Sequence, residues 1–191
     1  MSDTTLLEGA RRMNEDALVE IFELYAPVLY KYAFRLCRDA LVADHIVGDV
    51  FTKFLEHLSA GAGPSTNLRS YLYEMAYHLV VDEMRYSQRS APIEAVSFRH
   101  RDVYSTDASV ETRVLFQAAL RTIKTVLTAD QRHVVILRFL NGLSLKETAA
   151  ILGKEVGNVK VIQSRAIAAL RVTLDYQTIE TSAISLARGD D

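Results

Sequence analysis

Residues 144–174 read SLKETAAILGKEVGNVKVIQSRAIAALRVTL, and this stretch decides the expected fold of the second half of the chain. Ser144, with Glu147 three residues later, is the pattern of a capping box at a helix start. Gly153 suits a tight turn, because glycine adopts the left-handed backbone conformation without strain. The stretch therefore predicts a short helix, a turn at Gly153 and a longer helix, which is the layout of a helix-turn-helix.

The longer of these two helices has an apolar and a polar side. Val159, Ala166 and Leu170 lie at helical spacing and are expected to pack, whereas the cations on the other side suit phosphates or guanine edges in a major groove. A helical hairpin whose charged face is merely solvated fits the same pattern. The candidate DNA contacts are Asn158, Lys160, Gln163, Ser164, Arg165 and Arg171.

Charge is distributed unevenly along the chain, whose net charge is −2. Residues 111–174 carry 10 Lys and Arg against 4 Asp and Glu, a balance of +6, whereas residues 1–89 carry 9 against 13, a balance of −4. A basic block inside an acidic chain is typical of a segment that contacts nucleic acid. The charge therefore favours DNA contact by residues 111–174 over simple solvation.

The composition excludes several classes of protein. With 49% hydrophobic and 24% charged residues, the 191-residue chain is not disordered throughout, and 1 Cys excludes a disulfide framework and a Cys-based zinc cluster. No apolar run approaches the ~20 residues of a membrane span, and the N-terminus lacks the apolar core of a signal peptide. We therefore expect a cytoplasmic protein without membrane insertion.

Helical periodicity almost throughout, without long alternating runs, predicts an all-α fold of two small domains joined by a flexible linker. Asn14 is the expected cap of a helix that Pro27 kinks or splits, and Asp39 of a helix over 40–58. That second helix is expected to bury Leu41, Val42, Ile46, Val47, Val50, Phe54 and Leu58. The expected organisation is a helical domain at 10–89, a linker at 90–110, the helix-turn-helix domain at 111–174 and an acidic tail at 175–191.

A third helix, predicted from Leu68 to Arg89, is dense in aromatic residues. Aromatic faces beside cations suit stacking on unpaired bases and holding a single-stranded backbone. The alternative, favoured by this helix taken alone, is that the tyrosines pack on their own domain while their hydroxyls reach water. The residues concerned are Asn67, Arg69, Tyr71, Tyr73, Tyr77, His78, Arg85, Tyr86 and Arg89.

Two motifs together resemble a known family. Residues 43–58, ADHIVGDVFTKFLEHL, followed by 67–85, NLRSYLYEMAYHLVVDEMR, resemble region 2 of sigma factors of the sigma-70 family. Residues 127–171 resemble region 4 of the same family, from LTADQRHVVILRFLNGLSLKETAAILG to the end of the basic helix. Their order and the short linker are similar to the compact extracytoplasmic-function (ECF) group.

This resemblance implies a sigma factor, which is not an enzyme and needs no cofactor. It implies binding to the beta-prime clamp helices and beta flap of core RNA polymerase, promoter recognition with melting of the −10 element, and regulation by an anti-sigma factor. The implied polymerase contacts are Asp44, Asp49, Lys53 and Phe51, the last being either a contact or a core residue. The implied −10 contacts are Asn67, Arg69, Tyr71, Tyr77, His78 and Arg85, and the six candidates on the basic helix would read the −35 element.

Two other classes of function stay open from sequence. A repressor or activator that binds duplex DNA alone would explain residues 111–174 and leave the first half without a specific role. A helical enzyme is disfavoured, because the five His show no HExxH spacing and the chain contains no P-loop or GxSxG pattern. Cys37 lies in an apolar helix and is more consistent with a core residue than with a nucleophile.

Overall fold

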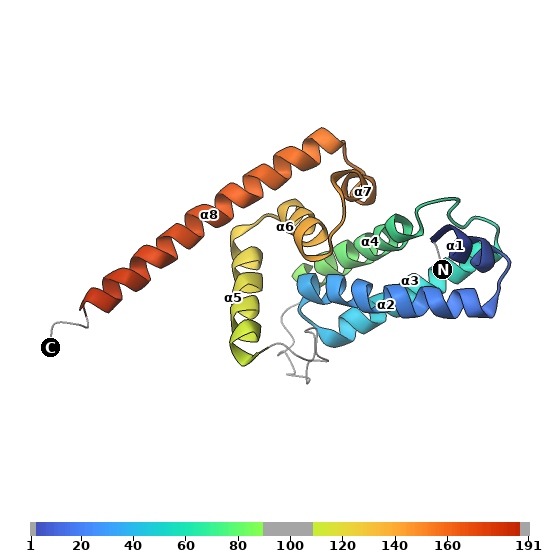
Figure 1. The fold of residues 1–191 in the computed structure, drawn as a ribbon, viewed down its shortest axis with the longest axis horizontal. Coiled ribbons are helices and arrows are strands. Elements are labelled where there is room, and N and C mark those ends of the chain that lie inside the picture. Colours follow the sequence, from blue (N-terminus) through green and yellow to red (C-terminus); the bar gives the residue numbers. More distant parts are fainter. Residues whose placement is uncertain (1–2, 90–108, 188–191) are drawn as a thin grey trace.

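The computed structural model describes residues 3–89 and 109–187, and within these ranges the chain is helical and contains no strand. Two groups of helices pack side by side, and the last helix projects away from them (Figure 1). The first group comprises α1 (Asp3–Arg11), α2 (Glu15–Cys37), α3 (Ala40–Ser59) and α4 (Leu68–Arg89). The second comprises α5 (Val110–Val126), α6 (Ala129–Val135), the π-helical turn η1 (Ile136–Leu140), α7 (Leu145–Ile151) and α8 (Val156–Ala187).

Helix α2 begins where the sequence predicts, because the Asn14 side chain accepts a hydrogen bond from the Ala17 amide at 2.9 Å. Of the kink or split predicted at Pro27, the split does not occur, since α2 is a single helix from Glu15 to Cys37. Proline frees the carbonyl four residues earlier, here that of Glu23. Both Pro27 and Glu23 are exposed, so water can satisfy the freed carbonyl and the helix continues.

Helix α3 begins at the predicted cap, with the Asp39 carboxylate accepting from the Leu41 and Val42 amides. Its buried side is mostly the predicted one, from Ile46 to Leu58. Val42 is only partly buried, and Leu41 is the clear exception, because its side chain is 59% exposed. At 3.6 residues per turn, Leu41 lies about 180° around the helix from the fully buried Val50, which explains the error.

Helix α1 is a part of the first domain that the sequence analysis did not predict. Leu6, Leu7 and Ala10 are buried and belong to the same core as α2. With nine residues, α1 is too short for its apolar spacing to stand out from the sequence. Helix α4 has the predicted bounds, and it follows a loop that ends at Asn67, whose φ is +54°.

The second domain is organised by local capping. A capping box joins Thr128 and Gln131 at the start of α6, and a second one joins Ser144 and Glu147 at the start of α7, as predicted. Gly153, at φ +60°, makes the turn between α7 and α8 in the left-handed region. The helix-turn-helix predicted from residues 144–174 is therefore present, and the buried Ala149 lets α7 lie close to its neighbours.

Removing the α7 cap should cost stability. Ser144→Ala deletes the oxygen that accepts the Glu147 amide at 3.1 Å, so we expect the free energy of unfolding to fall by about 1 kcal/mol in urea denaturation. Ser87→Ala is the matched control, because the exposed Ser87 hydroxyl donates to the Met84 carbonyl within a helix and caps no helix start. Equal stability of the two variants would contradict the capping role.

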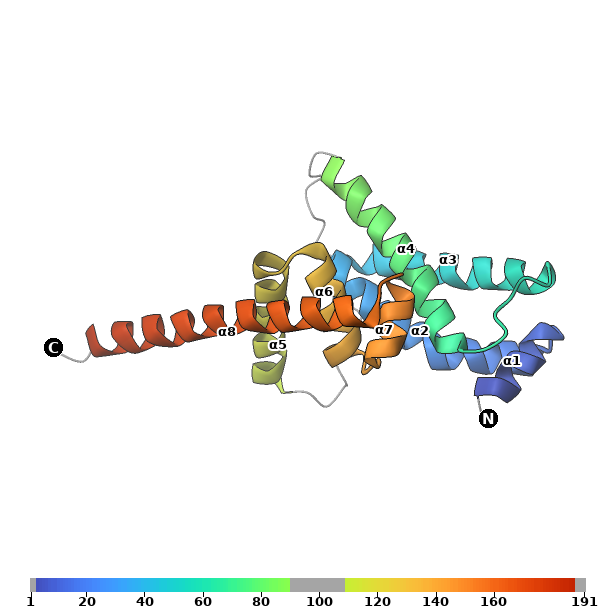
Figure 2. The same cartoon turned by 90° about the horizontal axis from the view of Figure 1, so that it is seen from above.

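Helix α8 is longer than predicted, since it continues past residue 174 to Ala187. Residues 175–187 contain neither Gly nor Pro, so no residue of this stretch breaks the helix. The extension points away from both domains (Figure 2).

Of the linker predicted at 90–110, residues 90–108 lie outside the described residues.

The two domains pack on each other and share one hydrophobic core. That core runs from Tyr32 and Leu72 in the first domain to Leu137, Leu143 and Leu152 in the second, and α4 lies against α7. Just after α2, the Arg38 guanidinium donates to the amide oxygen of Gln117 in α5 at 2.5 Å. The closeness of the two domains in Figure 1 is therefore a packed interface.

Candidate nucleic-acid and polymerase interfaces

Helix α8 presents a polar face to solvent. Val159 and Ala166 are fully buried and anchor one side of the helix in the second domain. The opposite side carries exposed polar and basic residues, and the helix follows α7 through the Gly153 turn as the second helix of the helix-turn-helix. Five of the six predicted −35 residues are exposed on it: Asn158, Lys160, Ser164, Arg165 and Arg171.

Gln163 differs from these five, because it is half-buried and bonded within its own domain. Its amide oxygen accepts from Nε of Arg138 at 3.1 Å. The same guanidinium donates to the Leu143 carbonyl, which fixes the segment before α7. Gln163 thus supports the position of α8 through Arg138, which is not among the site residues predicted from the sequence.

Helix α3 carries the predicted polymerase-contact residues. Asp44 and Lys53 are exposed, and the half-exposed Asp49 lies 3.7 Å from Nε2 of His45, one helical turn earlier. Phe51 is buried in the core, with its ring centroid 4.8 Å from that of Phe22. Of the two roles that the sequence leaves open for Phe51, its position is that of a core residue.

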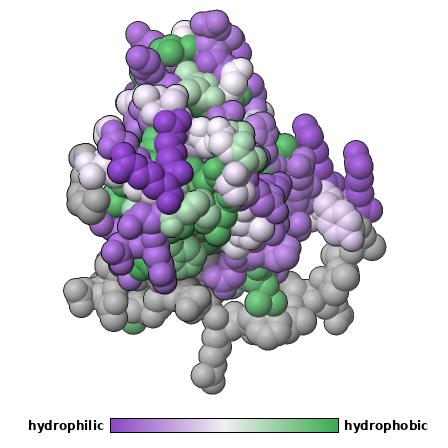
Figure 3. All heavy atoms as spheres, turned by 90° about the vertical axis from the view of Figure 1, so that its right-hand side faces the viewer, coloured by the Kyte–Doolittle hydropathy of each residue, from purple (hydrophilic) through white to green (hydrophobic). Residues whose placement is uncertain are grey.

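An apolar contribution to this surface comes from α2 and was not predicted. Val19 and Phe22 are each 51% exposed, and Phe22 covers Phe51 of α3. Their spacing of three residues places both on one side of α2, which is the signal that could have found them. Hydrophobic surface between hydrophilic side chains is visible at the end of the molecule where α1 lies (Figure 3).

The predicted −10 residues are divided between solvent and the domain interface. Asn67, His78 and Arg85 are exposed, with Arg85 lying 3.7 Å from the Asp82 carboxylate on the same helix. The Tyr71 hydroxyl shares a hydrogen bond with Nδ1 of His57 in α3. These four residues keep an accessible or partly accessible surface.

Arg69 and Tyr77 instead contact the second domain. Nη2 of Arg69 donates to the Asn141 carbonyl at 2.7 Å, and Nη1 lies 4.0 Å from the Glu147 carboxylate. Tyr77 meets the ring of His133 edge-on, with ring centroids 4.9 Å apart and an interplanar angle of 84°. Burial alone would raise the pKa of Glu147, but its bonds to Ser144, together with Arg69 and Arg138, lower it and keep the carboxylate charged.

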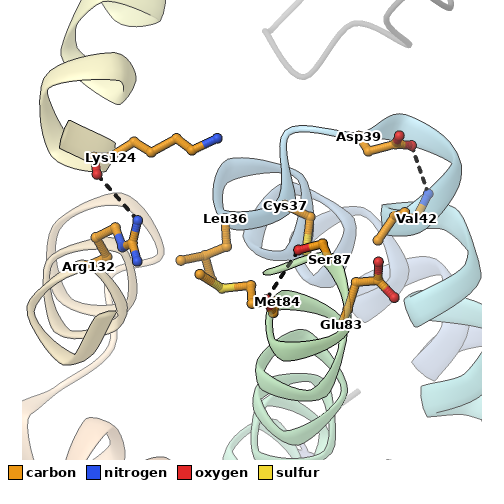
Figure 4. Close-up of a pocket in the computed structure, with 9 residues that line it drawn as sticks. All are labelled: Leu36, Cys37, Asp39, Val42, Glu83, Met84, Ser87, Lys124 and Arg132. Carbon is orange, nitrogen blue, oxygen red and sulfur yellow. Dashed lines mark hydrogen bonds between the residues drawn. The ribbon is translucent and has the colours of Figure 1, made fainter. Parts of the chain in front are cut away.

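A hollow of about 320 Å³ lies between the two domains (Figure 4). Asp39 and Glu83 lie on the side of the first domain, and Lys124 and Arg132 on the side of the second. Cys37 also lines it, and burial raises the pKa of its thiol to about 12. A neutral thiol is a poor nucleophile, so Cys37 behaves as a packing residue.

Among residues 3–89 and 109–187, the His, Cys, Asp and Glu side chains form no group of three or more that could hold a metal ion. In the same ranges, no helix combines the length and apolar character that crossing a membrane requires.

Two family models match this chain in the predicted order. The model "Sigma-70 region 2" matches residues 21–90, and the model "Sigma-70, region 4" matches residues 125–172. Together they cover more than half of the chain. The first includes α3 and α4 with the candidate polymerase and −10 residues, and the second includes the helix-turn-helix.

Named relatives have the same family description. The ECF RNA polymerase sigma factor BldN of Streptomyces coelicolor is 28% identical over 168 residues, which is 86% of this chain and 63% of that protein. This chain thus spans less than two thirds of the length of BldN. SigD of Mycobacterium tuberculosis, also an ECF sigma factor, is 29% identical over 165 residues, covering 83% of this chain and 77% of SigD.

Two solved structures have a similar fold, and one of them is described as a sigma factor. CnrH, solved with the cytosolic domain of CnrY, superposes with a TM-score of 0.68 at 23% identity, over 91% of this chain and 97% of that chain. The sigma factor RpoE from Bartonella quintana, solved with the anti-sigma factor NepR, superposes with a TM-score of 0.63 at 26% identity. This match covers 82% of this chain and 95% of the RpoE chain. From the two matched regions and these relatives, the chain belongs to the sigma-70 family of RNA polymerase sigma factors, in the extracytoplasmic-function group.

Proposed function

We propose that this chain binds core RNA polymerase and directs it to promoters that carry its −10 and −35 elements. The observation that carries the proposal is the exposed basic face of α8, on the second helix of a helix-turn-helix that follows a sigma region 2. A helix with such a face enters the major groove of duplex DNA. Arg165 and Arg171 would contact phosphates or guanine edges, and Asn158 would reach bases or the backbone.

The first domain would bind polymerase and the melted −10 strand. Asp44, Asp49 and Lys53 of α3 supply exposed charges for the clamp helices, and Phe22 supplies the apolar centre that protein interfaces require. The region 4 domain would bind the beta flap. The net negative charge of the first domain does not oppose binding to the −10 strand, because we propose that its larger contact is with polymerase rather than with DNA.

The −10 residues would act on separated strands. Unstacking a base costs a few kcal/mol, which stacking on Tyr71 or Tyr77 and contacts from Arg69 would offset. His78 and Arg85 lie further along α4 and would follow the strand. In this role the chain carries out no turnover chemistry and is not an enzyme, and it works in the cytoplasm beside the chromosome.

An anti-sigma factor is the partner that we propose for regulation. The support is the similarity to RpoE of Bartonella quintana, which is 26% identical to this chain. The structure of RpoE was solved in complex with the anti-sigma factor NepR. Both domains of this chain carry exposed apolar residues, including Phe22 and Val114, that such a protein could cover.

Run-off transcription tests the proposed function. The full chain is added to sigma-free core polymerase on a library of genomic promoters from the source organism. Promoter-dependent transcripts are the expected result. A chain that binds promoter duplex tightly alone and yields no transcript would instead be a helix-turn-helix regulator.

The α3 surface gives a sharper prediction for polymerase binding. Asp49→Ala removes a half-exposed charge, so we expect the Kd for core polymerase to rise by roughly 5- to 30-fold, the effect of losing a charge pair in an interface. Glu56→Ala, an exposed acid near the end of the same helix, is the control and should change the Kd by less than about 2-fold. Equal Kd values for wild type and Asp49→Ala, measured by fluorescence anisotropy, would remove Asp49 from the interface.

A further inference from the structure

We propose that α8 reads its −35 element in part through an apolar contact, in which Val161 packs against the 5-methyl group of a thymine in the major groove. One position of the element is then fixed as an A·T pair whose thymine faces Val161. This contact rests on the proposed function, and within it on the entry of α8 into duplex DNA. Val161 is not among the six −35 residues predicted from the sequence.

Val161 lies in the middle of the outward side of α8. Its side chain is 47% exposed, whereas Val159 and Ala166 are fully buried against the second domain. At about 100° per residue, Val161 lies roughly 200° around the helix from Val159 and roughly 140° from Ala166. Its side chain therefore points away from the core, at the centre of the surface that would face DNA.

The neighbours of Val161 on this side are short. Gly157 lies one turn before it and Ser164 one turn after it, and both are exposed. The space at Gly157 is open, since a Cβ atom there would meet no atom within 4 Å, so the packing of the domain does not require a glycine. Short neighbours let the edge of a base pair come close to the valine. Further along the same side, a shallow hollow is lined by Ser164, Ile167, Ala168, Arg171 and Val172.

Exposed cations lie on both sides of Val161. Lys160 is about 100° around the helix in one direction, and Arg165 is about 40° in the other. The major groove is about 12 Å wide and admits one helix, with phosphates along both of its walls. Cations on the two flanks of α8 suit those phosphates, which places Val161 over the edges of the bases.

The chemistry of the base edges makes thymine the partner of Val161. In the major groove the edges present hydrogen-bond donors and acceptors, and the thymine 5-methyl group is their apolar part. A valine packed on a guanine oxygen or a cytosine amino group would displace water and leave that polar atom without a partner, which is costly. Packed on a methyl group, the same side chain buries apolar surface and gains free energy. Val161 therefore selects a thymine.

Replacing thymine with uracil tests this contact, because the change removes the methyl group and keeps the hydrogen-bonding groups of the base pair. The probe is a promoter identified by run-off transcription, in which each thymine of the −35 element is replaced in turn. Holoenzyme is reconstituted from the full chain and sigma-free core polymerase, and the Kd for each duplex is measured by competition in fluorescence anisotropy.

Val161→Ala is the test variant, and Val110→Ala is the matched control. Val110 is the first residue of α5 and is 74% exposed, so the control removes the same atoms from an exposed helical position outside α8. Alanine is a better helix former than valine, and neither side chain is in the core, so both variants should fold. Both should bind core polymerase with the Kd of the wild type.

At one thymine of the element, the uracil replacement should raise the Kd of the wild-type holoenzyme about 4-fold, the effect of losing one buried methyl group. Val161→Ala should bind the thymine and uracil duplexes equally, and Val110→Ala should match the wild type. Two results would overturn the thymine contact. One is that no uracil replacement raises the wild-type Kd by 2-fold or more, and the other is that Val161→Ala keeps the wild-type response.

Failure of this contact and failure of the proposed function give different results. Promoter-dependent transcription without any response to the thymine methyl groups overturns the contact and leaves the proposed function in place. A chain that neither binds core polymerase nor supports transcription overturns the proposed function. The contact is then decided on duplexes that the full chain selects alone from a random library, with the same uracil replacements, and selection of no duplex would overturn it.

Discussion

Replacing Arg165 with alanine should reduce transcription from promoters that depend on a −35 element by roughly 5- to 150-fold, because one guanidinium contact to DNA contributes about 1–3 kcal/mol. Arg165 is exposed on α8, beside the buried Ala166 that anchors the helix. Its loss removes a DNA contact without opening the core. Run-off transcription at saturating core polymerase measures the effect.

The control for this substitution is Arg121→Ala, which removes an exposed arginine from α5 of the same domain and keeps the basic face of α8. It should leave −35-dependent transcription within about 2-fold of wild type, and both variants should bind core polymerase normally. If Arg165 contacts a phosphate, the slope of log K against log salt for promoter binding should fall by ~0.9. Loss of polymerase binding in Arg165→Ala would show that the roles of the two domains are wrongly divided.

The second large effect is on stability. Leu137 is 0% exposed in the core that both domains share, so Leu137→Ala should lower the free energy of unfolding by about 2–5 kcal/mol, through lost burial and the cavity left behind. That is a large fraction of the stability of a domain this size. Urea denaturation followed by circular dichroism measures the change.

Phe139, two residues later in the same π-helical turn, is the matched control because its side chain is 54% exposed. Phe139→Ala removes a larger side chain and should nevertheless change the free energy of unfolding by less than about 1 kcal/mol. A larger loss in Phe139→Ala than in Leu137→Ala would mean that the packing described for this turn is incorrect.

Local features of the fold were predictable because their signals are local. The caps at Asn14, Asp39 and Ser144 each need one side chain within a few residues of a backbone amide, so the sequence carries the whole interaction. The left-handed turn at Gly153 is another such case. Helix periodicity likewise predicted α4 to its terminal residues.

The domain interface was not predictable, because periodicity says which side of a helix is buried and not against which partner. Tyr32 and His133 are far apart in sequence, and neither has a neighbour that indicates the other. Asn141 follows the end of the π-helical turn, where its residue type alone suggests a turn residue. The exposed Phe22 was not predicted, because hydrophobicity alone does not distinguish a surface contact from a core residue.

The candidate site follows the same division. The exposed side of α8 could be predicted from the spacing of its apolar residues. Five of the six residues predicted to contact DNA are exposed in the structure. Arg69 and Tyr77 were selected for their chemistry, and their positions depend on a second domain that the sequence of α4 does not reveal. Their contacts connect the proposed −10 surface to the second domain.

Binding of the purified full chain to sigma-free core RNA polymerase is the most direct measurement of the central claim. Titration of a fluorescently labelled chain with core enzyme, followed by gel filtration, should give a saturable complex of one chain per polymerase that starts transcription at specific promoters. Absence of binding across a range of salt and pH, with the chain shown to be folded, would contradict the account even if α8 bound duplex DNA well.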